Sequence, residues 1–472
     1  MWDFIIRRNK KIMNKKIIPT ALTSAIILSI LAGCGATTSV EPEKPTETTN
    51  TEISETQNPG TSKLPEIETP IKNPEDILIE EPTKETEIDI NSEVKNLAFN
   101  SFENEVINYL HKDKENYMLS TLSFRYAMAL ASAGANGETQ KELLSAMGFS
   151  SMDEYMEWTE NINELTDNFS DALNKDIQDA KEYGYPGMPM PERALEIANS
   201  IWHNTDKSGI IKQDYINYIR EYFNATADNV PQSELVATVN NWAEEKTKGL
   251  ISSLLPDSAA EANTILVNTL YMKSPWLSQF EEYNTKEDEF TTIDGEKTNK
   301  EFMNKQDNFA FYEDKDSKLI VLPMEGGIDM IVVLGNNENI SDKLQKVNYE
   351  EVILKLPKFE VETSFDQKEL INYLKHKGVD LALRKDGTAD FSTMIEDAEI
   401  SIDDIIQKTK IKVDENGTEA AAATAIIMTD GMMMPTEKPK PKEFVADKPF
   451  TYYIVASNGE NSELLFYGQY VK

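Results

Sequence analysis

Two kinds of periodic pattern follow each other along the chain from about residue 92 to its end. In the first half, apolar residues recur every three or four positions, which predicts helices because such residues share one helical face. In the second half, short runs of β-branched and aromatic residues predict strands. The expected helices are 94–110, 124–133, 140–147 and 233–254. The expected strands are 265–272, 318–323, 329–334, 351–356, 452–456 and 464–467.

Turn residues punctuate this pattern. Gly134-Ala135-Asn136-Gly137 separates two of the expected helices, and the Gly- and Pro-rich stretch 184–191 is an expected exposed insertion. We find no second linker and no internal repeat. Helices followed by mostly antiparallel strands predict one α+β domain over residues 92–472.

The stretch before this domain has a different composition. Residues 34–91 are rich in Thr, Pro and Glu and contain few apolar side chains. Such a segment cannot bury enough surface to offset the entropy of ordering it. We expect a disordered acidic tether, and a flexible coil of about 60 residues would span about 40–45 Å.

The amino terminus combines basic residues with an apolar run. The basic residues are Arg7, Arg8, Lys10, Lys11, Lys15 and Lys16. The apolar run 17–31 follows, and the pattern predicts an export signal peptide over residues 1–33. An uncleaved membrane anchor is the alternative, although the run is shorter than the roughly 20 residues that span a bilayer.

The end of this signal is Leu31-Ala32-Gly33-Cys34, which resembles the bacterial lipobox. The resemblance implies that a lipid is attached to the thiol of Cys34, which becomes the first mature residue. Cys34 is the only cysteine of the chain, so no internal disulfide is possible.

Charge and histidine content exclude several classes of function. The formal net charge of -35 repels nucleic acid, so we expect no nucleic-acid partner. The three histidines, His111, His203 and His376, have no metal-ligand spacing, and the chain has no G-x-S-x-G elbow. We therefore expect a protein that is not an enzyme and that carries neither metal nor cofactor.

Residues 414–434 do not fit the surrounding strands. Their alanine run predicts a short helix by propensity alone. The run ends in Met432-Met433-Met434, an apolar cluster that is unusual for a solvated loop. A buried piece of core is the alternative interpretation.

Six motifs in order resemble the serpin family, and the resemblance extends over about residues 93–472. The motifs are Asn199-Ser200-Ile201-Trp202, residues 239–251, residues 266–273 with Trp276, Leu356-Pro357-Lys358-Phe359, Ala389-Asp390-Phe391-Ser392 and the stretch 415–424. The resemblance implies the serpin fold, with about nine helices around three β-sheets and an exposed reactive-centre loop over about 415–442. It also implies a serine-type endopeptidase inhibitor that acts as a suicide pseudo-substrate. In this family a protease cuts the loop, and the loop then inserts into the central sheet as an extra strand.

The start of the loop, here called the hinge, is implied by the resemblance. Its residues are Glu415, Gly417, Thr418, Glu419, Ala420, Ala421, Ala422, Ala423 and Thr424. Alternate residues of a strand share a face, and the face that begins at Thr418 carries only small or apolar residues through Met428. Burying that face would leave no charged group without a partner, which favours an inhibitor over a non-inhibitory relative.

Family spacing from the hinge places the reactive bond between Gly431 and Met432, within a window from Asp430 to Met433. Methionine at the bond would suit elastase-, chymotrypsin- or subtilisin-like proteases, whereas Asp430 would suit an acid-specific protease. Trypsin-like targets are disfavoured because the window contains no Lys or Arg.

The resemblance also implies a region where the central sheet opens. Its residues are Ser120, Ser123, Asn268, Gln407 and Trp276. Gln407 stands where the family usually has a histidine, and its amide can both donate and accept hydrogen bonds. The alternative is that these are ordinary buried residues, with Trp276 part of the core.

Together these features predict an extracytoplasmic monomer, lipid-anchored through Cys34 to a bacterial cell membrane or released from it. Its expected partner is a serine-type protease bound as a covalent target. Two alternatives stay open: a non-inhibitory serpin-fold binding protein or chaperone, and a solute-binding lipoprotein.

Overall fold

The computed structural model describes residues 97, 100–185, 190–365, 367–396, 400–418, 440–457 and 462–472. The expected signal peptide, the lipidation residue Cys34 and the tether lie outside these residues, so they remain predictions. The same is true of the hinge from Glu419 to Thr424 and of the window Asp430–Met433. Within the described ranges, no helix is long and apolar enough to cross a membrane.

Eight α-helices lie in the described residues. They are α2 (Ser101–Tyr109), α3 (Thr121–Gly134), α4 (Gly137–Ala146), α5 (Met152–Tyr183), α6 (Gln213–Phe223), α7 (Gln232–Lys246), α8 (Ile340–Leu344) and α9 (Gln367–His376). The expected start of α2 at residue 94 is wrong because Asn100 caps the helix. The Asn100 side chain accepts a hydrogen bond from the Glu103 amide, and the Glu103 carboxylate accepts one from the Asn100 amide.

The expected helix 233–254 also ends earlier than predicted. Helix α7 stops at Lys246, and Lys248 and Gly249 have φ angles of 52° and 86°. These left-handed conformations cannot continue a right-handed helix.

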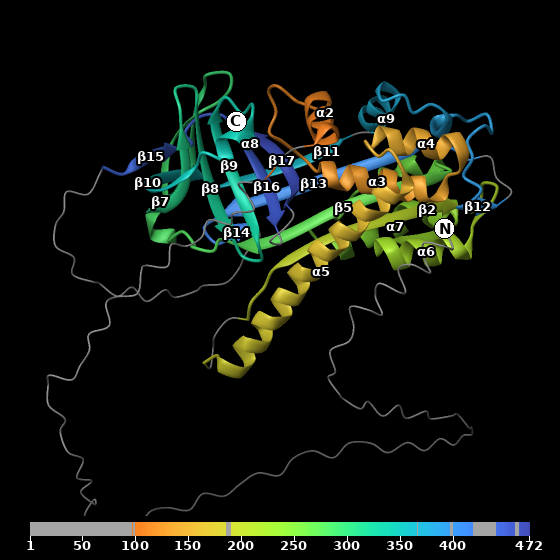
Figure 1. Cartoon of the computed structure of the whole chain (residues 1–472), viewed down its shortest axis with the longest axis horizontal. Helices are drawn as coiled ribbons and strands as arrows, with labels where there is room; N and C mark the ends of the chain where they lie inside the picture. The colour runs from red at the N-terminus through yellow and green to blue at the C-terminus, as the bar shows by residue number, and fades with distance from the viewer. Residues whose placement is uncertain are drawn as a thin grey trace, which may run out of the picture. The chain divides into compact units, whose positions relative to one another are not determined.

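Helices α5, α6, α8 and α9 were not among the expected helices, and α5 is the longest of the four. Helix α5 begins after Ser151, whose side chain accepts a hydrogen bond from the Glu154 amide. Most apolar residues of its first half are buried, whereas its second half is largely exposed and reaches away from the rest of the domain (Figure 1). The exposed insertion expected at 184–191 is therefore preceded by a long polar helix, and Tyr183 and Tyr185 at its end are exposed.

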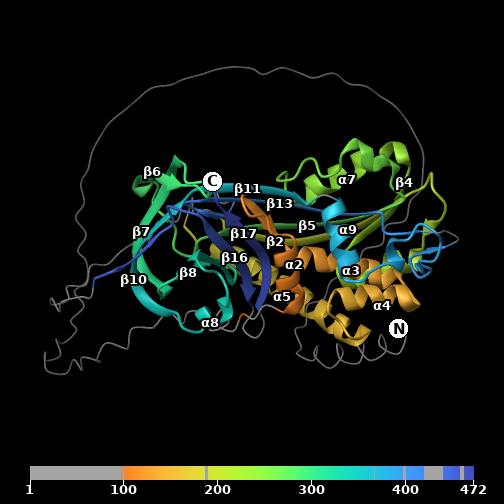
Figure 2. The same cartoon turned by 90° about the horizontal axis from the view of Figure 1, so that it is seen from above.

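The first sheet has six strands and forms the middle of the domain (Figure 2). Its order is β11 (Phe359–Phe365), β13 (Asp404–Asp414), β14 (Gly417–Thr418), β5 (Thr264–Pro275), β2 (Ala194–Asn204) and β4 (Thr226–Val230). Figure 2 shows α7 on one face of this sheet and α3 on the other. Under α7, the rings of Trp202 and Trp242 pack edge to face at 6.1 Å in a buried apolar cluster.

The second sheet has nine strands. They are β1 (Tyr117–Leu119), β17 (Ser462–Tyr470), β16 (Phe450–Ser457), β9 (Ile328–Gly335), β8 (Ser317–Met324), β7 (Lys297–Glu313), β10 (Asn348–Pro357) and β15 (Lys442–Val445), with β6 (Lys286–Thr291) paired to β7. Five of the six expected strands lie within this sheet, and the sixth lies within β5. All its pairs are antiparallel except β10 with β15.

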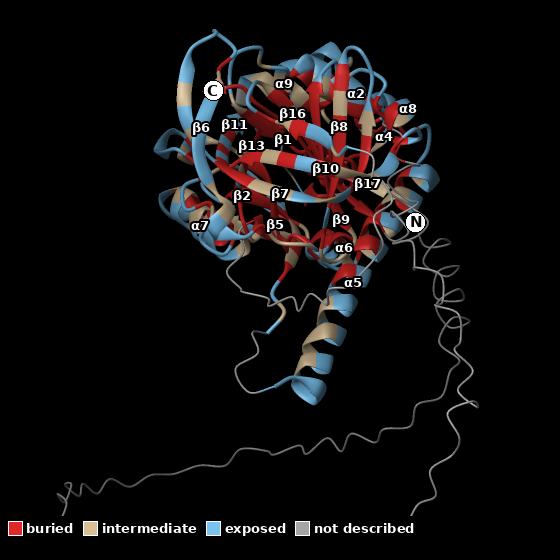
Figure 3. Ribbon diagram, turned by 90° about the vertical axis from the view of Figure 1, so that its left-hand side faces the viewer, coloured by how far each residue is buried: buried red, intermediate tan, exposed pale blue. Residues whose placement is uncertain are grey.

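A third, two-stranded sheet joins β3 (Ile210–Ile211) to β12 (Ile395–Glu396). Buried residues concentrate in the strands, and exposed residues cover the outer helices and the free part of α5 (Figure 3). The expected α+β class with three sheets is confirmed.

Candidate functional site: the hinge and the sheet that receives it

The described part of the hinge forms a strand of its own. After β13 the chain turns, and β14 runs antiparallel to both β13 and β5, which lie on either side of it. Thr418 lies between Val413 and Ser274 and is 1% exposed. Its Oγ1 accepts a hydrogen bond from the Ser274 amide at 3.1 Å and donates one to the Ser274 carbonyl at 3.2 Å. The hinge has therefore begun to fill a space between two strands of the central sheet.

Gly417 is required at this entry point. Its φ of 140° is rare for residues with a side chain, and a Cβ there would lie 2.3 Å from the Ser274 carbonyl oxygen and 2.6 Å from Pro275 Cα. Both contacts are with backbone, which cannot swing aside.

Glu415 ties the turn before β14 to the neighbouring sheet. Its carboxylate is 7% exposed, lies 3.2 Å from the Lys358 ammonium and accepts a hydrogen bond of 2.7 Å from Thr285 Oγ1. Burial opposes its ionisation, but the hydrogen bonds from Thr285, the Glu415 amide and Lys358, together with the charge of Lys358, lower the pKa of Glu415. Sequence reasoning missed both partners, although Lys358 lies in one of the motifs that carried the family resemblance.

Trp276 holds the same turn from the end of β5. Its indole Nε1 donates to the Asp414 carbonyl at 2.8 Å, and its amide donates to the Asn416 carbonyl at 2.9 Å. It is 3% exposed. Trp276 is therefore more than core packing, because it supplies two donors that fix where the hinge begins.

Further along the sheet, Gln407 bonds to the start of α3. Its Oε1 accepts from the Ser120 amide at 3.1 Å, and its Nε2 donates to the Ser120 carbonyl at 2.8 Å. Ser120 also caps α3, since its Oγ accepts a hydrogen bond of 3.0 Å from the Ser123 amide. The amide of Gln407 thus uses both its donor and its acceptor on a single backbone residue.

Asn268 is the neighbour of Gln407 across the β5–β13 pair. It accepts a hydrogen bond from Ser123 Oγ and donates one to the Oδ1 of Asn199 in β2. Asn199 was noted in a motif, but its role beside Asn268 was not foreseen. We call Ser120, Ser123, Asn268 and Gln407 the latch, because they tie β5 and β13 to the same end of α3.

Between the latch and β14, the two central strands separate. β13 pairs directly and in parallel with β5 only from Asp404 to Gln407, opposite Ile265 to Asn268. The next five residues of each strand, 408–412 and 269–273, do not pair with each other. The sheet is thus closed at the latch, entered by β14 at the other end and unpaired between them.

The histidines lie on separate elements. His111 Nδ1 is 2.9 Å from the Tyr117 hydroxyl, and His203 is buried in β2, which lowers its pKa. His376 ends α9. In the part of the chain that the structure describes, no three His, Cys, Asp or Glu side chains come together as metal ligands would.

Comparison with known proteins agrees with this architecture. The family model for serpins (serine protease inhibitors) matches residues 94–472. Serpin-ZX of Arabidopsis thaliana is 30% identical over 387 residues, which cover 75% of this chain and 92% of that protein. Neuroserpin of Homo sapiens is 28% identical over 384 residues, covering 76% of this chain and 86% of that protein.

A solved structure, that of the thermophilic serpin tengpin in its native state, superposes with a TM-score of 0.62. It is 25% identical, and the match covers 83% of this chain and 96% of that one. The family match over four-fifths of the sequence and the arrangement of the sheets give the same answer: the chain belongs to the serpin family.

Proposed function

We propose that this protein inhibits serine-type endopeptidases as a suicide pseudo-substrate. The family and the fold support a serpin-type protease inhibitor. The observation that carries the mechanism is β14, which lies between β13 and β5 with unpaired strand on both sides ahead of it.

The register of β14 predicts how the rest of the hinge would continue. Thr418 lies opposite Val413 and Ser274. In an unbroken antiparallel strand, Ala420 would then lie opposite Ile411 and Met272. In the same register, residues 419–423 would fill the five unpaired positions, and Thr424 would lie opposite Gln407 and Asn268, where the latch is closed.

The side chains that flank this path suit such a strand. Thr409, Ile411 and Val413 are buried on the face that would receive Thr418, Ala420 and Ala422. Small side chains entering there displace little and leave no unpaired charge. On the opposite face, Glu419 would lie beside the ammonium groups of Lys412 and Lys273, so the one charge in the segment meets opposite charges.

Further insertion requires the latch to release. Four residues of β13 would leave their parallel partners in β5 and gain an antiparallel neighbour in the hinge instead. The exchange adds strand pairs overall, and this net gain is what would drive the loop into the sheet after cleavage.

In the chemical step, the protease serine would attack the carbonyl carbon of Gly431. The acyl-enzyme would form on Gly431, and the amine of Met432 would leave with the remainder of the chain. The window Asp430–Met433 supports a target with an apolar specificity pocket. Mass spectrometry of the cleaved loop fixes the bond, and a cut outside this window would contradict the assignment.

The decisive experiment is a denaturing gel after mixing the protein with subtilisin, elastase or chymotrypsin. We expect a detergent-resistant band of the combined mass, and none for Ala420→Arg, which should be cleaved as a substrate. Clean cleavage of the parent by every one of these proteases, without such a band, would leave only a non-inhibitory serpin-fold binding protein.

We further propose display at the cell envelope. The support is the basic and apolar amino terminus that ends at the single cysteine, Cys34. Radiolabelled palmitate should label the parent and not Cys34→Ser when each is expressed in a bacterium with the lipidation pathway. Equal labelling of the two would refute lipidation at this residue.

A further inference from the structure

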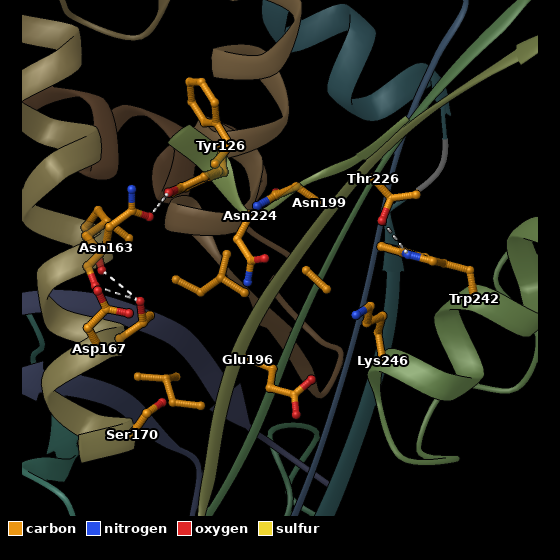
Figure 4. A pocket seen from close by; sticks show the side chains of 16 residues that line it. Tyr126, Asn163, Asp167, Ser170, Glu196, Asn199, Asn224, Thr226, Trp242 and Lys246 are labelled. Atoms are coloured by element: carbon orange, nitrogen blue, oxygen red, sulfur yellow. Dashed lines mark hydrogen bonds between the residues drawn. The ribbon is translucent and has the colours of Figure 1, made fainter. Parts of the chain in front are cut away.

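A small pocket lies between α5, β2, the end of α6 and α7 (Figure 4). Its volume is about 200 Å³. Sites for drug-sized ligands are roughly 300–1,000 Å³, so this pocket suits a smaller solute. One of its lining residues is Asn199, the partner of Asn268 in the latch.

The pocket runs along the edge of a β-strand. Five consecutive residues of β2, from Leu195 to Asn199, line it. Successive side chains of a strand face opposite sides, so consecutive residues line one pocket only where it follows the strand edge. β4 pairs with β2 from Ser200 to Asn204, and no described strand pairs with this edge before Ser200. Such an edge can accept an extended peptide by main-chain hydrogen bonding.

Asn199 leaves a donor free at this edge. Its side chain is 1% exposed, and its Oδ1 accepts from Asn268. Its Nδ2 has no hydrogen-bond partner among the described residues. A buried donor without an acceptor is unfavourable, and a ligand oxygen in the pocket would supply the missing acceptor.

Two side chains of opposite charge line the pocket. Figure 4 shows Asp167 on α5 and Lys246 on α7, on opposite sides of β2. Neither side chain makes an ion pair or a hydrogen bond within the described ranges, whereas the side chain of Glu196 between them is paired with Lys248 at 3.2 Å. The pocket therefore presents one carboxylate and one ammonium without partners.

We propose that this pocket binds a dipeptide with free termini. The peptide main chain pairs with the β2 edge, its carboxylate faces Lys246 and its ammonium faces Asp167. An oxygen of the ligand accepts the hydrogen bond that Asn199 Nδ2 offers. A free edge, a buried donor and two opposite charges are the features that a zwitterionic peptide satisfies together.

A peptide bound in the pocket would affect protease inhibition, and this effect rests on the proposed function. Asn199 holds Asn268, which Ser123 holds in turn, so a ligand that fixes Asn199 stabilises the closed latch. Short peptides with free termini are products of proteolysis. Their binding would slow loop insertion, and more inhibitor would be consumed as substrate for each protease molecule captured.

Binding is tested by titration calorimetry on the uncleaved full-length protein, without any protease. We expect saturable binding of L-alanyl-L-alanine at or below about 10 mM, and binding of N-acetyl-L-alanine amide at least about tenfold weaker because its ends are uncharged. Asp167→Asn and Lys246→Met should each weaken dialanine binding about tenfold.

Two variants on the exposed side of α5, Asp171→Asn and Lys175→Met, are matched controls and should bind as the parent does. Thermal melting of each variant establishes that it is folded. The proposal is overturned if dialanine shows no saturable binding at about 10 mM, if the blocked peptide binds equally well, or if the control variants lose as much affinity.

The effect of bound peptide on inhibition is measured in a separate experiment. Dialanine should raise the number of parent molecules consumed per protease molecule inhibited, and it should leave that number unchanged for Lys246→Met. An equal response of the two proteins would refute the coupling to the latch. Because peptide binding is measured without protease, a failure of the proposed inhibitor function would not change the binding result, and the two failures can be told apart.

Discussion

At the scale of single residues, the entry of the hinge depends on Gly417 and Glu415. Gly417 has no Cβ, so the backbone of β5 can approach it closely. Glu415 lies two residues earlier and is neutralised by Lys358. One residue provides space and the other provides an anchor, and neither property depends on the reactive bond.

Gly417→Ala should expel β14 from the sheet. The added Cβ would overlap the backbone of Ser274 and Pro275. The amides of Ser274 and Trp276, which donate to Thr418 and Asn416, should then exchange with solvent about tenfold faster or more, for about 1–2 kcal/mol of lost local stability.

Hydrogen exchange with mass spectrometry measures this change. Gly378→Ala is the control, because Gly378 also has a positive φ, of 85°, but an added Cβ would meet no atom within 4 Å. Unchanged exchange at Ser274 and Trp276 in Gly417→Ala would show that the close approach is not needed to seat the hinge.

Glu415 should contribute to stability against acid. Its pKa in the folded protein lies below its ordinary value of 4.5, so the folded state favours the carboxylate. The resulting stabilisation is complete above pH 4.5 and is lost as the pH falls through the lowered pKa. We therefore expect the free energy of unfolding to fall less steeply with acid in Glu415→Gln than in the parent.

Urea unfolding at a series of pH values tests this expectation. Glu301→Gln is the matched control, since Glu301 lies 3.7 Å from the same Lys358 but is 62% exposed. If Glu415→Gln and the parent have the same acid slope, the carboxylate of Glu415 is not an acid-sensitive anchor.

At the scale of elements, β13 has two roles along its length. Its first residues pair directly with β5 and bond to α3 through Gln407, whereas its last residues pair with β14. The strand therefore takes part both in the direct pairing with β5 at the latch and in the pairing with β14 at the other end of the unpaired positions. Its side chains alternate between lysines on one face and buried Thr409, Ile411 and Val413 on the other.

Gln407→Ala should weaken the closed end. Its loss would leave the amide of Ser120, which is fully buried, without a partner, and the Ser120 carbonyl would keep only the hydrogen bond from the Phe124 amide. We expect a loss of about 1–3 kcal/mol in the free energy of unfolding, measured by urea denaturation.

Gln306→Ala serves as the control for this variant. Gln306 is exposed, and among the described residues its side chain bonds only to the Glu351 carboxylate, so its replacement should change stability by less than about 0.5 kcal/mol. Equal effects of the two substitutions would contradict a structural role for the Gln407 amide.

At the scale of the whole molecule, the uncleaved protein holds an incomplete sheet. On their facing edges, β13 and β5 pair with each other over four residues and with Gly417 and Thr418 of β14, and the five positions between these two regions are unpaired. A domain with unmade strand pairs at its centre is less stable than the same domain with those pairs made. In the proposed mechanism, cleavage of the loop would release the constraint that keeps the hinge out.

Cutting the loop should therefore stabilise the protein. We expect the melting temperature of the parent to rise by more than about 10 °C after proteolysis, since each kcal/mol gained in a large domain shifts melting by a few degrees. Differential scanning calorimetry of cut and uncut protein measures the shift.

A pair of substitutions tests the predicted faces of the inserted hinge. Ala420→Arg puts a charge on the buried face and should abolish the rise, whereas Ala421→Arg, on the other face, should retain most of it. A full rise in Ala420→Arg would refute insertion in the register of β14.

Local pattern was enough for much of the fold. Strands such as β8, β9 and β16 have apolar periodicity of their own and were predicted within a few residues. The hinge is likewise a prediction from local pattern, because a run of Ala and Thr without charge on alternate positions is a local property. The polar second half of α5 was missed for the converse reason, since a helix with few buried residues carries little periodicity.

The sequence by itself thus determined the family and the α+β class, and it predicts where the hinge begins. Only the tertiary structure decided that Gln407 bonds to Ser120, 287 positions away, that Lys358 neutralises Glu415, and that the hinge enters between β13 and β5. Propensity and periodicity act between residues a few positions apart. Hydrogen bonds, ion pairs and strand register join segments that meet only when the chain has folded, so no local pattern could specify them.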